Sequence, residues 1–387
     1  MAFQSHGEGI VPVFAQQSAR EMDRIGRLPQ QVIDDATFGC LQAGWDRAVG
    51  ADADHLKSVE DIDRCLAAGF TSFTIDPGDL VQTTKRSPEP ADLHGVPWDA
   101  LEDDLGSLIR RYSGRSMVLA DEVLRFEEAD VLLAVAKYGR AVAHASTMYR
   151  HLMDRATSPV EVEIAVDESG SVTSPIEHVF LAEAMTRLGM RWVGFAPRFV
   201  GEFGKGVPYR GDLNALAVDL VRHAAIARRL GPYKLSLHSG SDKYEIYEMA
   251  REATGGLVHL KTSGTSYLEA LRIAATHDPR LFREIYGLSR ENYGAGSASY
   301  PVSADVESTP AAAELRDDQL VELLALPDSR QVLHVGFGAV LTNLDGKGRP
   351  MLRERLRSLI GREAATYSSN LREHIGRHLR PFSAVTR

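Results

Sequence analysis

The sequence predicts an α/β fold of the TIM-type (β/α)8 barrel class. Short apolar runs alternate with helical segments along most of the chain, a pattern typical of a parallel sheet covered by helices. Two of these runs, within residues 234–243 and 256–265, contain a histidine followed by a turn rich in Gly, Ser and Thr. Because the open rim of a barrel lies at the carboxyl ends of its strands, we expect the functional site at these turns.

Seven segments are expected to form strands, and they begin near residues 10, 70, 160, 191, 233, 256 and 332. Seven strands are one short of a closed barrel. Either a weak strand lies within residues 80–120 or 295–310, or the barrel is incomplete or irregular at its N-terminal edge. We interpret residues 1–387 as a single barrel domain, with a helical insertion at 80–158 and a helical C-terminal tail at 345–387.

Helical periodicity and helix start and stop signals place helices between the strands. Ser58, for example, starts a predicted helix that Gly69 ends. The Gly-Ala-Asp-Ala-Asp-His run at residues 50–55 is interpreted as a polar turn. The predicted helices cover residues 29–48, 58–67, 122–155, 177–188, 212–230, 267–277, 279–286 and 353–379.

The composition excludes several classes of protein. Against 44 basic residues stand 53 acidic ones, and the formal charge of −9 argues against nucleic acid or an anionic membrane as a partner. Only Cys40 and Cys65 are available, so neither a disulfide scaffold nor a cysteine-rich zinc module is expected. No apolar run approaches the roughly 20 residues that span a bilayer, and no signal peptide is visible. We expect a cytoplasmic protein that acts on a small molecule. A homo-oligomer is one state open to it.

The segment at residues 160–167 carries an unusual acidic face. Its alternate apolar residues form one face of a strand, which leaves Glu161, Glu163 and Asp167 on the other. Inside a barrel these carboxylates require cations or hydrogen-bond donors, and a bound metal ion meets that need. The alternative is an edge strand whose acidic face is in water.

The segment at residues 191–198 delivers Arg198 to the end of another predicted strand. A guanidinium group at that position suits a carboxylate or a phosphate through two parallel hydrogen bonds. A surface salt bridge is the alternative interpretation.

Seven runs span nearly the whole chain, at residues 13–18, 34–37, 50–57, 73–78, 196–201, 234–243 and 259–262. Together they resemble the tagaturonate epimerase family. Members of that family interconvert D-tagaturonate and D-fructuronate with a divalent metal ion, and they begin upstream of this chain with a strand that would be the eighth of the barrel. Local differences from the family pattern leave a neutral ketose, tagatose or fructose, as an alternative substrate.

The resemblance implies a particular chemistry. The two hexuronates differ at a hydroxyl-bearing carbon that is β to the ketone, so the carbonyl does not acidify the hydrogen on that carbon. Retro-aldol cleavage, rotation of the aldehyde fragment and re-addition would invert the centre. This route needs a base for the hydroxyl, a Lewis acid for the enediolate and a clamp for the carboxylate.

The resemblance and the strand ends together suggest residues for each role. The expected ligands of a divalent metal (Zn²⁺, Mn²⁺, Ni²⁺ or similar) are His55, His238 and His259, with His334 as a possible replacement for His259. The expected acid and base catalysts are Asp54 and Glu163. The expected substrate-binding residues are Arg198, Ser239, Ser241, Asp242, Lys243, Lys261 and Thr262.

A second interpretation belongs to another chemical class. The run around Lys261 also resembles the Schiff-base turn of deoxyribose-phosphate-type aldolases. A lysine whose pKa is lowered by burial could form an imine with a sugar or sugar phosphate and cleave the same type of bond without metal. The Ser239-Gly240-Ser241 turn would then hold a phosphate through backbone donors. A third interpretation is a catalytically silent barrel used for binding.

Overall fold

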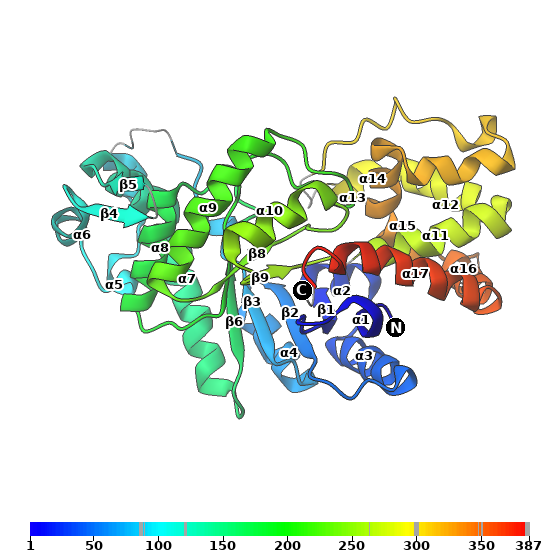
Figure 1. The fold of residues 1–387 in the computed structure, drawn as a ribbon, viewed down its shortest axis with the longest axis horizontal. Coiled ribbons are helices and arrows are strands. Elements are labelled where there is room, and N and C mark those ends of the chain that lie inside the picture. Colours follow the sequence, from blue (N-terminus) through cyan, green and yellow to red (C-terminus); the bar gives the residue numbers. More distant parts are fainter. Residues whose placement is uncertain are drawn as a thin grey trace.

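The fold is built on an open parallel sheet that curls into a half-barrel (Figure 1). The computed structural model describes residues 1–383 apart from 85–87, 89, 120, 121, 263, 298–301, 347 and 350. Within this part the strand order is β1-β2-β3-β6-β7-β8-β9, with every neighbouring pair parallel. The strands are β1 (Val13–Ser18), β2 (Gly50–Leu56), β3 (Ser72–Ile75), β6 (Glu161–Ala165), β7 (Gly194–Ala196), β8 (Lys234–Leu237) and β9 (Val258–Leu260).

The α/β class and the parallel sheet confirm the sequence-based prediction in its coarser form, but a closed eight-stranded barrel does not form among the described residues. Strands β1 and β9 lie at the two open edges of the sheet. The acidic strand β6 pairs with β3 on one side and β7 on the other. It is therefore an internal strand, which rules out the interpretation of residues 160–167 as a solvated edge.

Helices cover the outer face of the sheet, as expected for parallel strands linked by crossovers. Helices alternate with the strands along the chain, and the apolar residues of the helices and of the sheet form one continuous core. Side-chain caps fix several helix starts, for example Ser58, whose hydroxyl accepts a hydrogen bond from the amide of Asp61. The covering helices are α2 (Ala19–Ile25), α3 (Pro29–Ala43), α4 (Val59–Ala68), α7 (Glu128–Arg155), α8 (Pro175–Arg187), α9 (Leu213–Leu230) and α10 (Tyr244–Thr254).

Between β3 and β6 the chain forms a small separate layer. Strands β4 (Ser116–Leu119) and β5 (Glu122–Arg125) pair as an antiparallel hairpin, and α7 then returns to the main sheet. The prediction of helix from residue 122 was therefore wrong at its start, because β5 occupies residues 122–125. The other elements of this layer are η1 (Gly78–Leu80), η2 (Pro90–Leu93), α5 (Trp98–Leu101) and α6 (Leu105–Tyr112).

After β9 the chain forms a helical unit with its own apolar core (Figure 1, yellow to red). The N-terminal helix α1 (Ala2–His6) packs against the last helix of this unit, and the Ser383 hydroxyl donates to the His6 carbonyl. None of the helices in the described ranges is long and apolar enough to cross a membrane. The unit contains α11 (Thr265–His277), α12 (Pro279–Glu291), α13 (Tyr293–Ser297), η3 (Ala312–Glu314), η4 (Asp317–Leu324), α14 (Pro327–Val335), α15 (Phe337–Thr342), α16 (Met351–Arg362) and α17 (Ala364–Leu379).

Two predicted elements were wrong. The strand expected near residue 332 is helix α14, which Pro327 starts at its first turn. Its residues 329–335 are all buried, and a short run buried all round has no period that distinguishes strand from helix. The turn expected at residues 50–55 is strand β2, whose acidic side chains find their compensating charge on a residue far along the chain.

Candidate active site

Polar side chains gather where the strands of the half-barrel end. Asp54 and His55 lie at the end of β2, His238 directly follows β8 and Lys261 directly follows β9. Each of these side chains is buried. Since parallel strands bring their carboxyl ends to one rim, residues that are distant in sequence meet there.

Lys261 is the centre of a buried ion network at this rim. Its Nζ lies 2.9 Å from Asp52 Oδ2, 2.6 Å from Asp54 Oδ1 and 2.9 Å from Glu163 Oε1. It also donates to the Thr74 hydroxyl over 2.7 Å, and Thr74 in turn donates to Asp52. One ammonium group therefore compensates three carboxylates from two strands.

The electrostatics of this network keep its members charged. Burial by itself would lower the pKa of Lys261, but Asp52, Asp54 and Glu163 outweigh it and raise that pKa well above its ordinary value. Burial likewise opposes ionisation of Asp54 and Glu163, yet Lys261 and neighbouring histidines hold both carboxyl pKa values below their usual range. A Schiff-base lysine needs the opposite shift, so the structure contradicts the expectation that burial lowers the pKa of Lys261.

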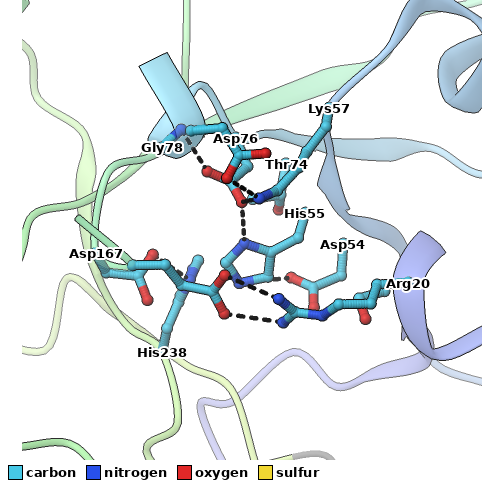
Figure 2. Close-up of polar contacts among 12 residues, drawn as sticks. Arg20, Asp54, His55, Lys57, Thr74, Asp76, Gly78, Asp167 and His238 are labelled. Atoms are coloured by element: carbon cyan, nitrogen blue, oxygen red, sulfur yellow. Dashed lines mark hydrogen bonds and ion pairs between the residues drawn. The ribbon is translucent and has the colours of Figure 1, made fainter. Parts of the chain in front are cut away.

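A second group, beside this network, brings together His55, His238 and Asp167 (Figure 2). One ligand atom from each lies within 4.8 Å of the others. The two imidazole rings are 4.8 Å apart between centroids, and His238 Nδ1 is 3.0 Å from Asp167 Oδ1. Neither of these last two atoms has an aligned hydrogen-bond partner in the described part of the chain. Two imidazoles and a carboxylate with unused lone pairs form a donor set that suits a divalent transition metal.

Outer partners orient both histidines of this group. His55 Nδ1 lies 2.9 Å from Asp76 Oδ2, and His238 Nε2 lies 2.7 Å from Glu163 Oε1. Carboxylates in this position fix the ring orientation and tautomer of metal-binding histidines. Despite burial, the surrounding carboxylates raise the pKa of His55 to about 10 and also raise the pKa of His238. The site therefore favours positive charge, and a divalent cation fits it.

Two adjoining cavities open at this rim. The smaller one is lined mainly by strand-end residues, including Asp54, His55 and Lys261. The larger one, of about 220 Å³, is lined by Asp167 and Arg198 among others. His238 and Ser239 line both, so the three-residue group lies at the boundary between the two cavities.

The remaining predicted site residues are distributed unevenly. Ser239 and Ser241 line the smaller cavity, and Arg198 lines the larger one while donating to the carbonyl of Asp167 over 3.2 Å. His259 lies outside the three-residue group, with its Nδ1 2.9 Å from Glu163 Oε2. Thr262 lies beyond the cavity lining, where its carbonyl accepts from a helix-start hydroxyl.

Lys243 and Asp242 brace the loop after β8 instead of lining either cavity. The buried Nζ of Lys243 donates to the carbonyls of Gly204 and Val207, and burial lowers its pKa to about 7. Asp242 forms an ion pair with Arg330. Both residues therefore connect the loop to neighbouring segments of the chain.

Sequence reasoning missed several members of the site. Asp167 was noted as acidic but not chosen as a ligand, and Asp52, Thr74 and Asp76 were not selected. A period of two was the available signal, because Asp52 and Asp54 share one face of β2. That signal was lost when residues 50–55 were interpreted as a turn.

Asp242 also faces two histidines of α17. The Asp242 amide donates to His378 Nε2 over 3.0 Å, and the Thr265 hydroxyl contacts His374 Nε2 at 2.7 Å. The three side chains lie close enough to share an ion. However, the guanidinium group of Arg330 already neutralises Asp242 and would repel a cation, so we assign this cluster a structural role.

Stability is expected to fall as the pH drops from about 6.5 to about 4, because burial lowers the pKa values of His374 and His378 to about 4. The unfolded chain takes up these protons first, so each histidine removes up to ~1.4 kcal/mol per pH unit from the free energy of unfolding. Melting temperatures across this range should decline less steeply in the His374→Gln, His378→Gln double variant than in the wild type. Equal slopes would contradict the assignment.

The chain is similar to known proteins along nearly its whole length. A family model described as tagaturonate epimerase matches residues 3–382. The tagaturonate/fructuronate epimerase of Thermotoga maritima is 38% identical over 373 residues, which are 96% of this chain and 75% of that protein. The native crystal structure of a fructuronate-tagaturonate epimerase from Cohnella laeviribosi is similar to this structure, with a TM-score of 0.90 and 32% identity. The match covers 97% of this chain and 76% of that one. The crystal structure of the same epimerase with two glycerol molecules has a TM-score of 0.91.

A parallel half-barrel with a charged, partly enclosed site at its strand ends defines the chain as a β/α-barrel-type enzyme. The matched relatives are epimerases of sugar acids, which are isomerases. The chain belongs to the tagaturonate epimerase family, which confirms the resemblance seen in its sequence.

Proposed function

We propose that the chain interconverts D-tagaturonate and D-fructuronate and uses a divalent cation to do so. The family supports the reaction. The observation that supports the metal is the group of His55, Asp167 and His238, with both histidines oriented by buried carboxylates. This ligand set exchanges the expected His259 for Asp167, because His259 is not part of the group and contacts the other carboxylate oxygen of Glu163 from the one that His238 contacts.

The inverted carbon is β to the ketone, so we propose a retro-aldol route. Asp54, which faces the smaller cavity, accepts the proton of the hydroxyl on that carbon. The bond between this carbon and the carbon next to the ketone then breaks, giving an aldehyde and an enediolate. A bound divalent cation would supply Lewis-acid stabilisation of the enediolate oxygens. The aldehyde rotates, the bond re-forms on its other face, and Asp54 returns the proton.

Lys261 and Glu163 support this chemistry through their contacts with Asp54 and His238. Lys261 donates to Asp54 and so holds the carboxylate in place and ionised. Glu163 is occupied by Lys261, His238 and His259, so we assign it the orientation of the ligand His238 and leave the proton transfer to Asp54. A protonated Lys261 also disfavours the imine route of the alternative aldolase function.

The cavity walls would hold the two arms of the substrate. Ser239 and Ser241 offer hydroxyl groups in the smaller cavity, and Arg198 offers a guanidinium group in the larger one. A six-carbon sugar acid bound at the boundary group would extend into both cavities. Asp242 and Lys243 would act indirectly, by fixing the loop that carries Ser239 and Ser241.

An epimerisation assay with purified protein tests the proposal. D-Tagaturonate is incubated with untreated protein, with EDTA-treated protein, and with treated protein resupplied with Mn²⁺, Ni²⁺ or Zn²⁺. We expect the formation of D-fructuronate to disappear with EDTA and to return with at least one metal. A parallel sample receives borohydride in the presence of substrate. Activity that resists EDTA but is destroyed by borohydride would replace the proposal with an imine mechanism at Lys261. Epimerisation of tagatose without epimerisation of D-tagaturonate would identify a neutral ketose as the substrate.

A further inference from the structure

Two residues of the smaller cavity do not come from strand ends or from the loop after β8. One is Lys205, in the loop between β7 and α9, and the other is His334, on α14 of the helical unit. These two residues therefore form a wall of the cavity that combines one loop of the half-barrel with one helix of the helical unit. We call Lys205 and His334 the basic wall.

Two glycines, Gly264 and Gly206, pack close to the ring of His334. A methyl group placed on Gly264, which has φ +94°, would lie 2.6 Å from His334 Cε1. A methyl group on Gly206 would lie 3.6 Å from His334 Cγ. Gly264 belongs to the turn after Lys261, and Gly206 follows Lys205. The ring is thus held between the two loops that border the cavity.

Contacts of α14 fix the loop that carries Lys205. The Arg330 Nε donates to the Gly206 carbonyl over 2.6 Å, and Gln331 donates to the Lys205 carbonyl over 3.4 Å. His334 itself is 8% exposed, and its Nδ1 has no hydrogen-bond partner among the described residues. Buried polar atoms are nearly always paired, so this orphaned nitrogen leaves the ring short of one partner, and the same ring lines the smaller cavity, where a ligand can contact it.

The charges around His334 are mostly positive. Burial lowers its pKa to about 3, and Lys205, Arg330 and Lys243 act in the same direction, against the single opposing carboxylate of Asp242. The imidazole is therefore neutral at physiological pH, and it carries one N–H donor on a ring that lines the cavity. A neutral donor beside an ammonium group in a positive environment is suited to an anion.

The larger cavity has a different charge pattern. Arg198 is accompanied there by three acidic residues: Asp167, Glu168 and Glu202. Glu168 is paired with Arg20, but the surroundings of Arg198 are still more acidic than those of the basic wall. A polyhydroxyl arm fits such a mixture of donors and acceptors better than a second carboxylate does.

We propose that the basic wall binds the carboxylate of the sugar acid, with the ammonium group of Lys205 and one ring N–H of His334 as its partners. The inference rests on the proposed function for the identity of the substrate. Lys205 and His334 then take the role of carboxylate clamp that the sequence suggested for Arg198. The rest of the substrate then passes the boundary group and places its hydroxyl groups in the larger cavity beside Arg198.

Binding and kinetics of five variants test the assignment. The variants are Lys205→Met, His334→Leu, His334→Gln, Arg198→Met in the larger cavity and, as a matched lysine control, Lys234→Met at the opposite end of β8. Calorimetric titration with D-gluconate measures carboxylate binding to the holoenzyme, and steady-state assays give KM and kcat for D-tagaturonate. Circular dichroism and melting curves report whether each variant is folded.

Loss of the clamp should weaken binding and leave turnover at saturation largely intact. We expect Lys205→Met and His334→Leu to raise the Kd for gluconate and the KM by about tenfold or more, with a much smaller change in kcat. His334→Gln keeps an N–H donor and should recover part of the affinity. Lys234→Met should behave as the wild type.

Other outcomes would overturn the assignment. Wild-type affinity in folded Lys205→Met and His334→Leu proteins would do so, and so would the absence of gluconate binding by the wild type. Loss of gluconate binding in Arg198→Met alone would move the carboxylate to the larger cavity. A wild type that binds gluconate through Lys205 but does not epimerise D-tagaturonate would support the basic wall and refute the proposed function.

Discussion

Replacing His238 with alanine is expected to lower kcat/KM for D-tagaturonate by at least about 100-fold and to remove most of the bound divalent metal. His238 lies between two carboxylates, with Nδ1 3.0 Å from Asp167 and Nε2 2.7 Å from Glu163. The substitution removes a proposed ligand and takes one partner from each of the two carboxylates, although Glu163 keeps Lys261 and His259. Loss of a ligand should cost more than the roughly 10–100-fold change typical of an outer partner.

Metal content measured by elemental analysis, together with steady-state kinetics, checks this expectation. His151→Ala is a matched control, because His151 lies on α7 and pairs with Asp63 away from the cavities. Asp76→Asn should give an intermediate loss, since Asp76 lies outside the three-residue group and contacts the outer nitrogen of His55. A His238→Ala protein with normal metal content and normal turnover would remove the three-residue group from the mechanism.

Replacing Lys261 with methionine is expected to abolish activity and to destabilise the protein by ~3–5 kcal/mol at neutral pH. The ammonium group is the shared partner of Asp52, Asp54 and Glu163, all of which are buried. Without it, burial raises the pKa values of Asp54 and Glu163 relative to those in the wild type. The variant should therefore regain stability relative to the wild type as the pH falls and the carboxyl groups take up protons.

Urea unfolding at several pH values measures this effect, and Lys261→Arg separates charge from nucleophilicity. The arginine variant keeps a positive charge beside the carboxylates, so it should retain most of the stability and some activity. An imine mechanism predicts no activity at all in Lys261→Arg. A Lys261→Met protein as stable and as active as the wild type would show that the ion network has no essential role.

Much of the architecture was predictable because the local periodicity of apolar residues determines it. The alternation of apolar runs with helical segments gave the parallel α/β sheet, and the positions of β3, β6, β7, β8 and β9 were confirmed. The prediction of a rim of polar residues at the ends of β8 and β9 also depended only on the alternation of side chains along a strand. Residues that match the family pattern along the chain gave the family.

The errors arose where local pattern and long-range contacts disagree. Strand β2 was interpreted as a turn because Asp52 and Asp54 are poor strand residues in isolation. They are tolerated in the interior because Lys261, more than 200 positions later, neutralises them. In α14 the reverse applies, because residues 329–335 are buried on all sides and have no amphipathic period to reveal the helix.

From its sequence alone this protein could be recognised as a parallel α/β enzyme of the tagaturonate epimerase family, with histidines and a lysine at the strand ends. The folded chain adds the partners of those residues. It places Asp167 rather than His259 beside His55 and His238, surrounds Lys261 with three carboxylates, and brings His334 from a helix to the cavity. These facts depend on distances between residues that are far apart in the chain, and such distances are set by packing and charge compensation in three dimensions, which no local pattern records.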